Sequence, residues 1–230
     1  MKKIAILQSN YIPWKGYFDL MNSVDEFVLF DDVQYTRRDW RNRNRIMTPE
    51  GPQWLSIPVN VKGRYTQLIK DVMVSDDKWR SRHWKTIESN YAKAKHFRDY
   101  KEEIRALYLE NDDRYLSDIN VKFIKFVNQK LGIKTKLRYS GEFELLSDKT
   151  ERLLSICEQC NASVYVSGPA AQEYFDEELA KKKGIAIEWF DYSGYPQYQQ
   201  MFEPFEHAVS ILDLLLNEGP DATSFMKSFH

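Results

Sequence analysis

The chain has 230 residues, a formal net charge of −1, 43% hydrophobic residues and 14% aromatic residues. This composition predicts a globular protein with a substantial core and excludes a disordered chain. The near-neutral charge also argues against a general nucleic-acid-binding protein, which is normally strongly basic.

The sequence predicts no membrane span, because no stretch approaches the roughly 20 apolar residues that a span needs. The amino-terminal segment MKKIAILQSN lacks the long apolar run and the small-residue cleavage site of a signal peptide. The two cysteines, Cys157 and Cys160, fit a reducing compartment. We therefore expect a cytoplasmic protein.

Short apolar runs in the first third of the chain predict strands. These strands are expected at 3–8, 26–32, 54–59 and 69–74. A loop with Pro13 and Gly16 is expected after the first strand. From 76 to 131 the pattern becomes helical, and the last helix of this block is expected to have its cap at Ser117 and to stop at Gly132.

Strands and helices alternate in the rest of the chain. Strands are expected at 135–140, 163–168 and 185–192. Helices are expected after the cap Ser147, from Ala170 to Gly184, and from Pro204 to Asn217 with its end at Gly219. This alternation predicts an α/β fold with a mostly parallel, Rossmann-like sheet and flanking helices. We expect one domain over residues 1–230, with a helical insertion or cap subdomain at about 76–131.

The Cys157-x-x-Cys160 pair lies within a predicted amphipathic helix. Cysteines on the apolar face of a helix usually pack in the core, and no second cysteine pair or nearby histidine completes a zinc site. We expect both thiols to be structural and assign no metal site.

Polar and aromatic residues follow the carboxyl ends of several predicted strands, where α/β sheets bind ligands. The candidate binding residues are Gln8, Asn10, Tyr11, Trp14 and Lys15 after the first strand, Tyr35 after the second, Ser167 and Gly168 after a later one, and Tyr195, Tyr198 and Gln199 after the last. Each group also has a structural interpretation: the aromatic side chains as core, and the Ser-Gly turn as a helix start. Their shared location favours a binding site.

The segment RRDWRNRNR, from Arg37 to Arg45, concentrates five arginines in nine residues. On a helix or on a strand, several of these guanidinium groups share a side and suit a phosphate or diphosphate. Trp40 or Tyr35 could stack on a base or sugar. The alternative is a solvated charged face balanced by nearby acids. The candidate ligands from this segment are Arg38, Trp40, Arg41, Asn42 and Arg43.

Several motifs together resemble the WbqC-like protein family over nearly the whole chain. They are QSNYIPWKGYFDLMNSVDEFVLFDDVQYTRRDWRNRNRI, WLSIPV, SGPAAQEYF, YPQYQQMFEPF and SILDLLLNEG. The sequence departs from the family at Leu7, where a histidine is expected, and at Ser9, where a proline is expected. The missing histidine argues against a base at the end of the first strand.

The resemblance implies a role in bacterial surface polysaccharide synthesis, including the O-antigen of lipopolysaccharide. It implies a transferase that adds an acyl or aminoacyl group to the amino group of a nucleotide-linked sugar. The donor could be coenzyme A or a carrier-protein thioester, and an acyl or aminoacyl carrier protein is a candidate partner. The arginine segment would then hold the diphosphate of the nucleotide sugar.

An N-acyl transfer needs a base. Of the four histidines, His83, His96, His207 and His230, we favour His83 because tryptophan and arginine surround it in WRSRHWK. Asp31 or Asp32 could serve instead. Neither cysteine suits a nucleophile, so direct transfer is expected. Two alternatives stay open: an ATP-using, adenylate-forming nucleotidylyltransferase-like enzyme, and a non-catalytic subunit that binds a sugar or a carrier.

Overall fold

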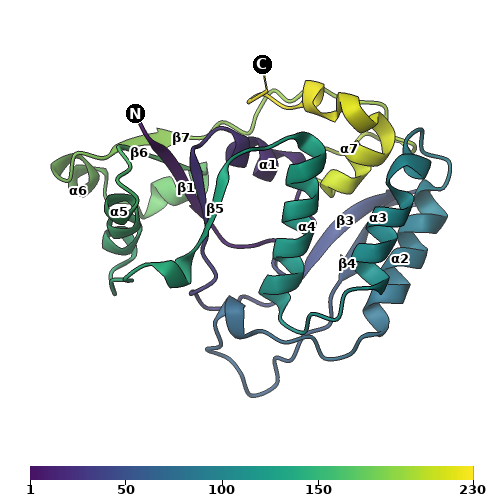
Figure 1. Cartoon of the computed structure of the whole chain (residues 1–230), viewed down its shortest axis with the longest axis horizontal. Helices are drawn as coiled ribbons and strands as arrows, with labels where there is room; N and C mark the ends of the chain where they lie inside the picture. Colours follow the sequence, from purple (N-terminus) through teal and green to yellow (C-terminus); the bar gives the residue numbers. More distant parts are fainter. Residues whose placement is uncertain (230) are drawn as a thin grey trace.

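The centre of the computed structural model, which describes residues 1–229, is a five-stranded parallel sheet (Figure 1). His230 lies outside the described residues. The strand order is β5-β2-β1-β6-β7, and all four strand pairs are parallel. The strands are β1 (Lys3–Leu7), β2 (Glu26–Leu29), β5 (Lys136–Tyr139), β6 (Val164–Ser167) and β7 (Ala186–Trp189). The predicted α/β class and parallel sheet are confirmed.

The sheet is doubly wound around its central strand. After β1 the chain builds β2 and β5 on one side, then returns to build β6 and β7 on the other. The strand order therefore reverses between β1 and β6, and a crevice is expected beyond the carboxyl ends of these two strands. The apolar sequence KIAIL of β1 fits this central place, because a strand covered on both faces needs apolar side chains throughout.

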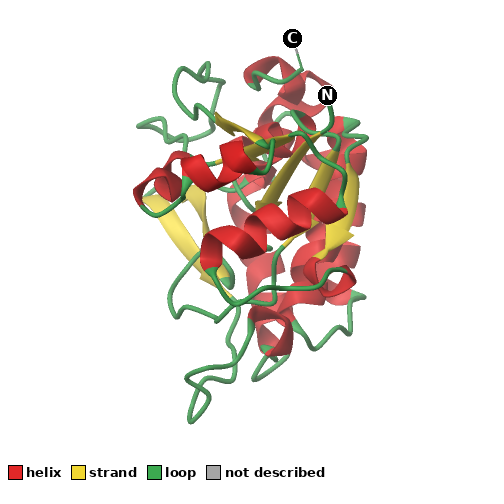
Figure 2. Cartoon of the chain, turned by 90° about the vertical axis from the view of Figure 1, so that its left-hand side faces the viewer, coloured by secondary structure: helices red, strands yellow, loops and turns green. Residues whose placement is uncertain are grey.

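Helices cover both faces of the sheet (Figure 2). On one face, Ile4 and Ile6 pack in a cluster with residues of α5 (Lys149–Gln159) and α6 (Glu177–Lys182). On the other, Ala5 belongs to a larger cluster that includes α1 (Lys15–Asn22) and α7 (Ile211–Glu218). Successive side chains of β1 thus point to opposite faces of the sheet and join two separate hydrophobic clusters.

The segment between β2 and β5 holds an antiparallel hairpin and three long helices. The hairpin strands are β3 (Arg43–Thr48) and β4 (Gly51–Ser56), and the helices are α2 (Lys78–Tyr91), α3 (Phe97–Leu109) and α4 (Leu116–Leu131). The helical character predicted for 76–131 is confirmed. Apolar residues of all three helices belong to the same core cluster as Ala5.

Two expectations in the first third of the chain are wrong. The stretch 69–74 is not a strand: Ile69–Asp71 forms a turn of 3-10 helix, and only single bridges follow, from Met73 to Tyr115 and from Val74 to Val59. The segment after β1 is not wholly a loop, because α1 begins at Lys15 and includes Gly16.

Several predicted helix boundaries are also displaced. Asp148, one residue after Ser147, caps α5 by accepting a hydrogen bond from the Glu151 N–H. The last helix begins only at Ile211, after a cap by Ser210. Side chains that compete for the role of cap explain these shifts, since serine and aspartate are both good N-caps.

Two further helix predictions need correction. Ser117 does not cap α4; it lies inside the helix, and its hydroxyl group donates to Asp31. The helix expected from Ala170 is divided into a 3-10 turn (Pro169–Glu173) and α6. The predicted stop at Gly132 is confirmed, because this residue ends α4 in the left-handed conformation.

Cys157 and Cys160 are free and buried, as expected for thiols that pack. Among the helices of residues 1–229, none has the length and the apolar character needed to cross a membrane.

Candidate functional site

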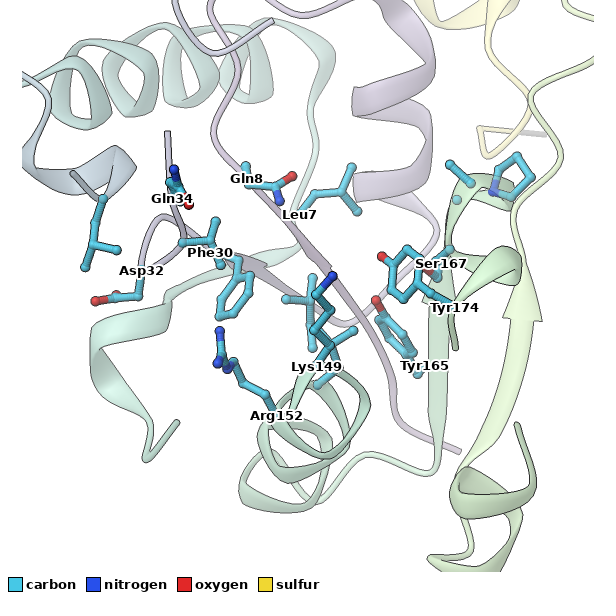
Figure 3. Close-up of a pocket in the computed structure, with 18 of the residues that line it drawn as sticks. Leu7, Gln8, Phe30, Asp32, Gln34, Lys149, Arg152, Tyr165, Ser167 and Tyr174 are labelled. Carbon is cyan, nitrogen blue, oxygen red and sulfur yellow. The ribbon is translucent and has the colours of Figure 1, made fainter. Parts of the chain in front are cut away.

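A cavity of about 1020 Å³ opens at the point where the strand order reverses (Figure 3). Its walls come from the ends of β1 and β6, the segment after β2, and the start of α5. The residues that line it are Ile6, Leu7, Gln8, Phe30, Asp32, Val33, Gln34, Leu68, Lys149, Arg152, Leu153, Tyr165, Ser167, Gly168, Pro169, Ala170, Ala171, Tyr174 and Tyr192. We call it the switch-point cavity.

Four of the predicted site residues meet in this cavity. Gln8 follows β1, Asp32 follows β2, and Ser167 and Gly168 end β6. Because β1 pairs in parallel with β2 and with β6, the carboxyl ends of these strands reach the same edge of the sheet. The aromatic ring of Tyr192 lies 3.5 Å from the position that a Cβ of Gly168 would take, which is ordinary van der Waals contact.

The cavity contains two cations that the sequence analysis did not single out. Lys149 and Arg152 stand on the first turn of α5, and their side chains point into the cavity (Figure 3). The guanidinium group of Arg152 donates to the backbone carbonyl of Ser147 at 2.8 Å, which restrains it. The amino group of Lys149 makes a looser contact, 5.9 Å from the centre of the exposed Tyr174 ring.

Asp32 supplies a carboxylate at the rim of the same cavity. It pairs with the ammonium group of Lys70 and accepts a hydrogen bond of 2.7 Å from the hydroxyl group of Ser140. Partial burial acts to raise the pKa of Asp32, but the hydrogen bonds from Lys70 and Ser140 outweigh burial, and the net pKa is lowered. Asp32 is therefore ionised at neutral pH.

Asp31 lies outside the cavity, although the sequence places it beside Asp32. One of its oxygens accepts from the backbone N–H of Ser9 at 2.8 Å, and the other accepts from the Ser117 hydroxyl group. Its side chain is 5% exposed. This carboxylate connects the loop after β1 to α4, and the catalytic role that the sequence suggested for it stays a prediction.

His83 does not lie near Asp32 either. It lines a second cavity, and its Nδ1 is 2.9 Å from the hydroxyl group of the fully buried Tyr11. Burial lowers the pKa of His83 to about 4, against a smaller opposite effect of the Ser56 backbone. The ring is neutral at pH 7, and the two kinds of base that the sequence suggested do not share a site.

The arginine segment is divided between two places. It forms a turn and the start of β3, and Arg41 donates to the side-chain oxygen of Gln8 at 2.9 Å, beside the switch-point cavity. Arg38, Asn42 and Arg43 line the second cavity, together with Tyr35. Trp40 is 39% exposed, with its ring 5.4 Å from that of Trp54.

The candidate residues of the last loop pack against the protein itself. Tyr195 donates to the carboxylate of Asp19, and Tyr198 donates to Asp213, each at 2.7 Å. Both tyrosines are buried, whereas the side chain of Gln199 is exposed. None of the three lines the switch-point cavity.

Lys15, Trp14 and Asn10 also lie beside the cavity rather than in it. The ammonium group of Lys15 donates to the carbonyl of Pro196 at 2.9 Å, and burial lowers the pKa of Lys15 to about 8. The Trp14 ring packs 5.5 Å from Tyr192, which lines the cavity. The buried side-chain oxygen of Asn10 has no hydrogen-bond partner within residues 1–229. Of these three residues, Trp14 is the one that packs against a residue of the cavity wall.

The cations of α5 were missed because they lie far along the chain from Gln8 and Asp32, which line the same cavity. The sequence did contain an indication that these two cations share a site. Lys149 and Arg152 are three residues apart at the start of α5, and the strand before this helix, β5, lies at the edge of the sheet. Side chains at this spacing share one face of a helix.

The fold and this cavity define a doubly wound α/β protein with a mixed-charge cavity at its switch point. Residues 8–225 match the WbqC-like protein family, and the chain belongs to this family. A Mycobacterium tuberculosis protein named "Uncharacterized protein Rv1507c" is 48% identical over 227 residues, which cover 99% of this chain and 98% of that protein. No solved structure matches the chain.

Proposed function

We propose that this protein is an enzyme of bacterial polysaccharide synthesis that transfers an acyl or aminoacyl group to the amino group of a nucleotide-linked sugar. The observation that carries the proposal is the switch-point cavity, which combines two cations with a carboxylate and two carboxamide side chains. Doubly wound sheets bind nucleotides in this crevice. The O-antigen is the polysaccharide that the family resemblance implies.

The cavity suits a nucleotide sugar in size and in chemistry. Its volume of about 1020 Å³ lies at the upper end of the range for small-molecule sites. The guanidinium group of Arg152, with Lys149 beside it, suits the diphosphate. Tyr174 and Tyr192 offer aromatic faces to a base or a sugar ring. Gln8 and Gln34 provide donors and acceptors for sugar hydroxyl groups.

Asp32 is the group in this cavity that suits the amino group of the acceptor. Its ionised carboxylate would pair with the substrate ammonium in place of Lys70 and then accept a proton. The free amine attacks the thioester carbonyl, the C–N bond forms, the C–S bond breaks, and the donor leaves as a thiol. Coenzyme A and a carrier-protein thioester are both suitable donors. Because these substrates are cytoplasmic, we place the reaction in the cytoplasm.

Calorimetric titration with uridine and thymidine diphosphate amino sugars tests substrate binding. We expect Arg152→Ala and Lys149→Gln to weaken binding by about tenfold or more, because each removes a charge-assisted contact to the diphosphate. The control is Arg98→Ala, because Arg98 is an exposed arginine on α3 that does not line the cavity. Equal affinity in all three variants, with their melting temperatures unchanged, would reject the proposal.

Turnover separates the transferase from the two alternatives. With an acyl-coenzyme A or a carrier-protein thioester as donor, we expect release of a thiol that depends on the amino sugar and falls in Asp32→Asn. An adenylate-forming enzyme would instead catalyse magnesium-dependent exchange of pyrophosphate into ATP. A binding subunit would bind the sugar and show neither reaction.

A further inference from the structure

A second cavity, of about 790 Å³, lies between the β3–β4 hairpin and α2. It is separate from the switch-point cavity, and no lining residue is common to both. Asn42 and Arg43 line the second cavity, whereas their neighbour Arg41 contacts Gln8 of the first. The start of β3 therefore divides two sites. We call this one the hairpin cavity.

The hairpin cavity has an unbalanced positive charge. No aspartate or glutamate is among its lining residues. Four arginines line it: Arg37, Arg38, Arg43 and Arg82. The whole chain carries a net charge of −1, so this concentration is local. A surface of one sign inside a concave wall raises the local concentration of ligands of the opposite sign.

Three of these guanidinium groups have no carboxylate within salt-bridge distance in the described part of the chain. These are Arg37, Arg38 and Arg43. Arg37 donates to the backbone carbonyl of Val61 at 2.9 Å, and Arg82 lies 3.8 Å from Asp76. The nearest acid in sequence, Asp39, pairs with Arg41 instead. Arg38 and Arg43 are thus available to an external anion.

Buried polar atoms of the lining also lack partners. The Nε atom of Arg43 and the Oδ1 atom of Asn42 are buried, and neither has a hydrogen-bond partner within residues 1–229. Asn42 is 9% exposed, and its Nδ2 donates to the Ile57 carbonyl at 2.8 Å, which fixes the amide group. Of these two atoms, the Arg43 Nε is a donor, so it is the one that suits an anion; buried donors are normally paired.

An aromatic surface stands at the edge of the same cavity. Trp54 lines the cavity and is 42% exposed, and the guanidinium carbon of Arg43 lies 4.1 Å from the centre of its ring. Trp40, which is also exposed, has its ring 5.4 Å from that of Trp54. Exposed tryptophan rings beside arginines are typical of sites where a nucleobase stacks and its phosphates are bound.

We propose that the hairpin cavity binds a second nucleotide, with its phosphates on Arg38 and Arg43 and its base against Trp54. If the transferase proposal above is correct, this is the site for the nucleotide part of a thioester donor such as coenzyme A. The binding itself does not depend on that proposal. The switch-point cavity then holds the acceptor, so that donor and acceptor bind on opposite sides of the start of β3.

Calorimetric titration with adenosine 3′,5′-diphosphate and, separately, with inorganic pyrophosphate tests the site. We expect Arg38→Ala and Arg43→Ala to lower the affinity for both ligands by about tenfold or more. We expect Trp54→Leu to weaken only the adenosine ligand, because pyrophosphate has no base to stack. Arg98→Ala, an exposed arginine on α3, is the matched control and should leave both affinities unchanged.

Arg38 is exposed in a turn, so its replacement should not unfold the protein, and Arg38→Glu extends the test by reversing the charge. Dissociation constants that are unchanged in Arg38→Ala and Arg43→Ala, or no binding of either probe below about 1 mM, would overturn the inference. Binding of adenosine 3′,5′-diphosphate that is lost in Arg152→Ala but kept in Arg43→Ala would overturn it as well, because the nucleotide would then occupy the switch-point cavity. Loss of nucleotide-sugar binding in Arg152→Ala tests the proposed function separately.

Discussion

Replacement of Asp31 tests whether this carboxylate is structural or catalytic. It is buried and accepts two hydrogen bonds, from the Ser9 N–H at 2.8 Å and from the Ser117 hydroxyl group. Hydrogen bonds to a charged group contribute about 1.5–3 kcal/mol each, so Asp31→Ala should lower the free energy of unfolding by about 3–6 kcal/mol. For a chain of this size the melting temperature should fall by about 6–24 °C.

Asp31→Asn should lower the free energy of unfolding by less than Asp31→Ala does, because the side-chain oxygen of asparagine can still accept the hydrogen bond from Ser9. Ser117→Ala leaves one carboxylate oxygen without this donor and should cost about 1–3 kcal/mol. Thermal and urea unfolding measure all three variants, with Asp112→Ala as an exposed control that should match the wild type. A melting temperature of Asp31→Ala within about 2 °C of the wild type would refute the structural role.

Three further predictions concern the stability of the fold and the reactivity of the thiols. The pKa of Asp32 is lowered in the folded protein, so its ionised form stabilises the fold above about pH 4, and this effect is lost as the pH falls through the lowered pKa. Lys70→Met should therefore lower the free energy of unfolding by less than about 1 kcal/mol at pH 7, and by a smaller amount at pH 3. An equal loss at both pH values in urea titrations would contradict it. Burial raises the pKa of Cys160 to about 11 and also raises that of Cys157, so neither thiol should react with iodoacetamide at pH 8 until urea is added. Mass spectrometry that finds the native protein alkylated would count against this. Gly219→Ala should lower the free energy of unfolding by more than about 1 kcal/mol, because φ of Gly219 is +55° and the new Cβ would lie 2.4 Å from the ring of His96. An unchanged thermal melt would show that this turn adapts.

The sheet could be predicted from the sequence because a parallel strand that is covered on both faces must be apolar. KIAIL and VYVS carry that pattern plainly. The helix α1 was missed because Pro13 and Gly16 are typical loop residues. The structure shows Pro13 just before the helix and Gly16 in its first turn, where the ring of Trp14 would lie 2.3 Å from an added Cβ.

The candidate site could be predicted only in part. Gln8, Asp32 and Ser167 follow strands, and the rule for open α/β sheets brings them together. No local pattern shows that Asp31 turns away from Asp32 toward Ser9 and Ser117, because this depends on the packing of α4.

The division of the arginine segment was also not visible in the sequence. The sequence was compatible with either a helix or a strand in this segment, and the structure shows a strand that begins only at Arg43. Asn44 is buried there and donates to the carbonyls of Tyr11 and Ile12, which fixes the hairpin against the loop after β1. This long-range contact decides which cavity each arginine faces.

The central claim is that the switch-point cavity binds a nucleotide sugar. A crystal structure of the protein soaked with a uridine diphosphate amino sugar tests it most directly. We expect the diphosphate within hydrogen-bond distance of Arg152 and Lys149, and the amino group of the sugar beside Asp32. Electron density for the ligand that lies only in the hairpin cavity, or elsewhere on the surface, would contradict the claim.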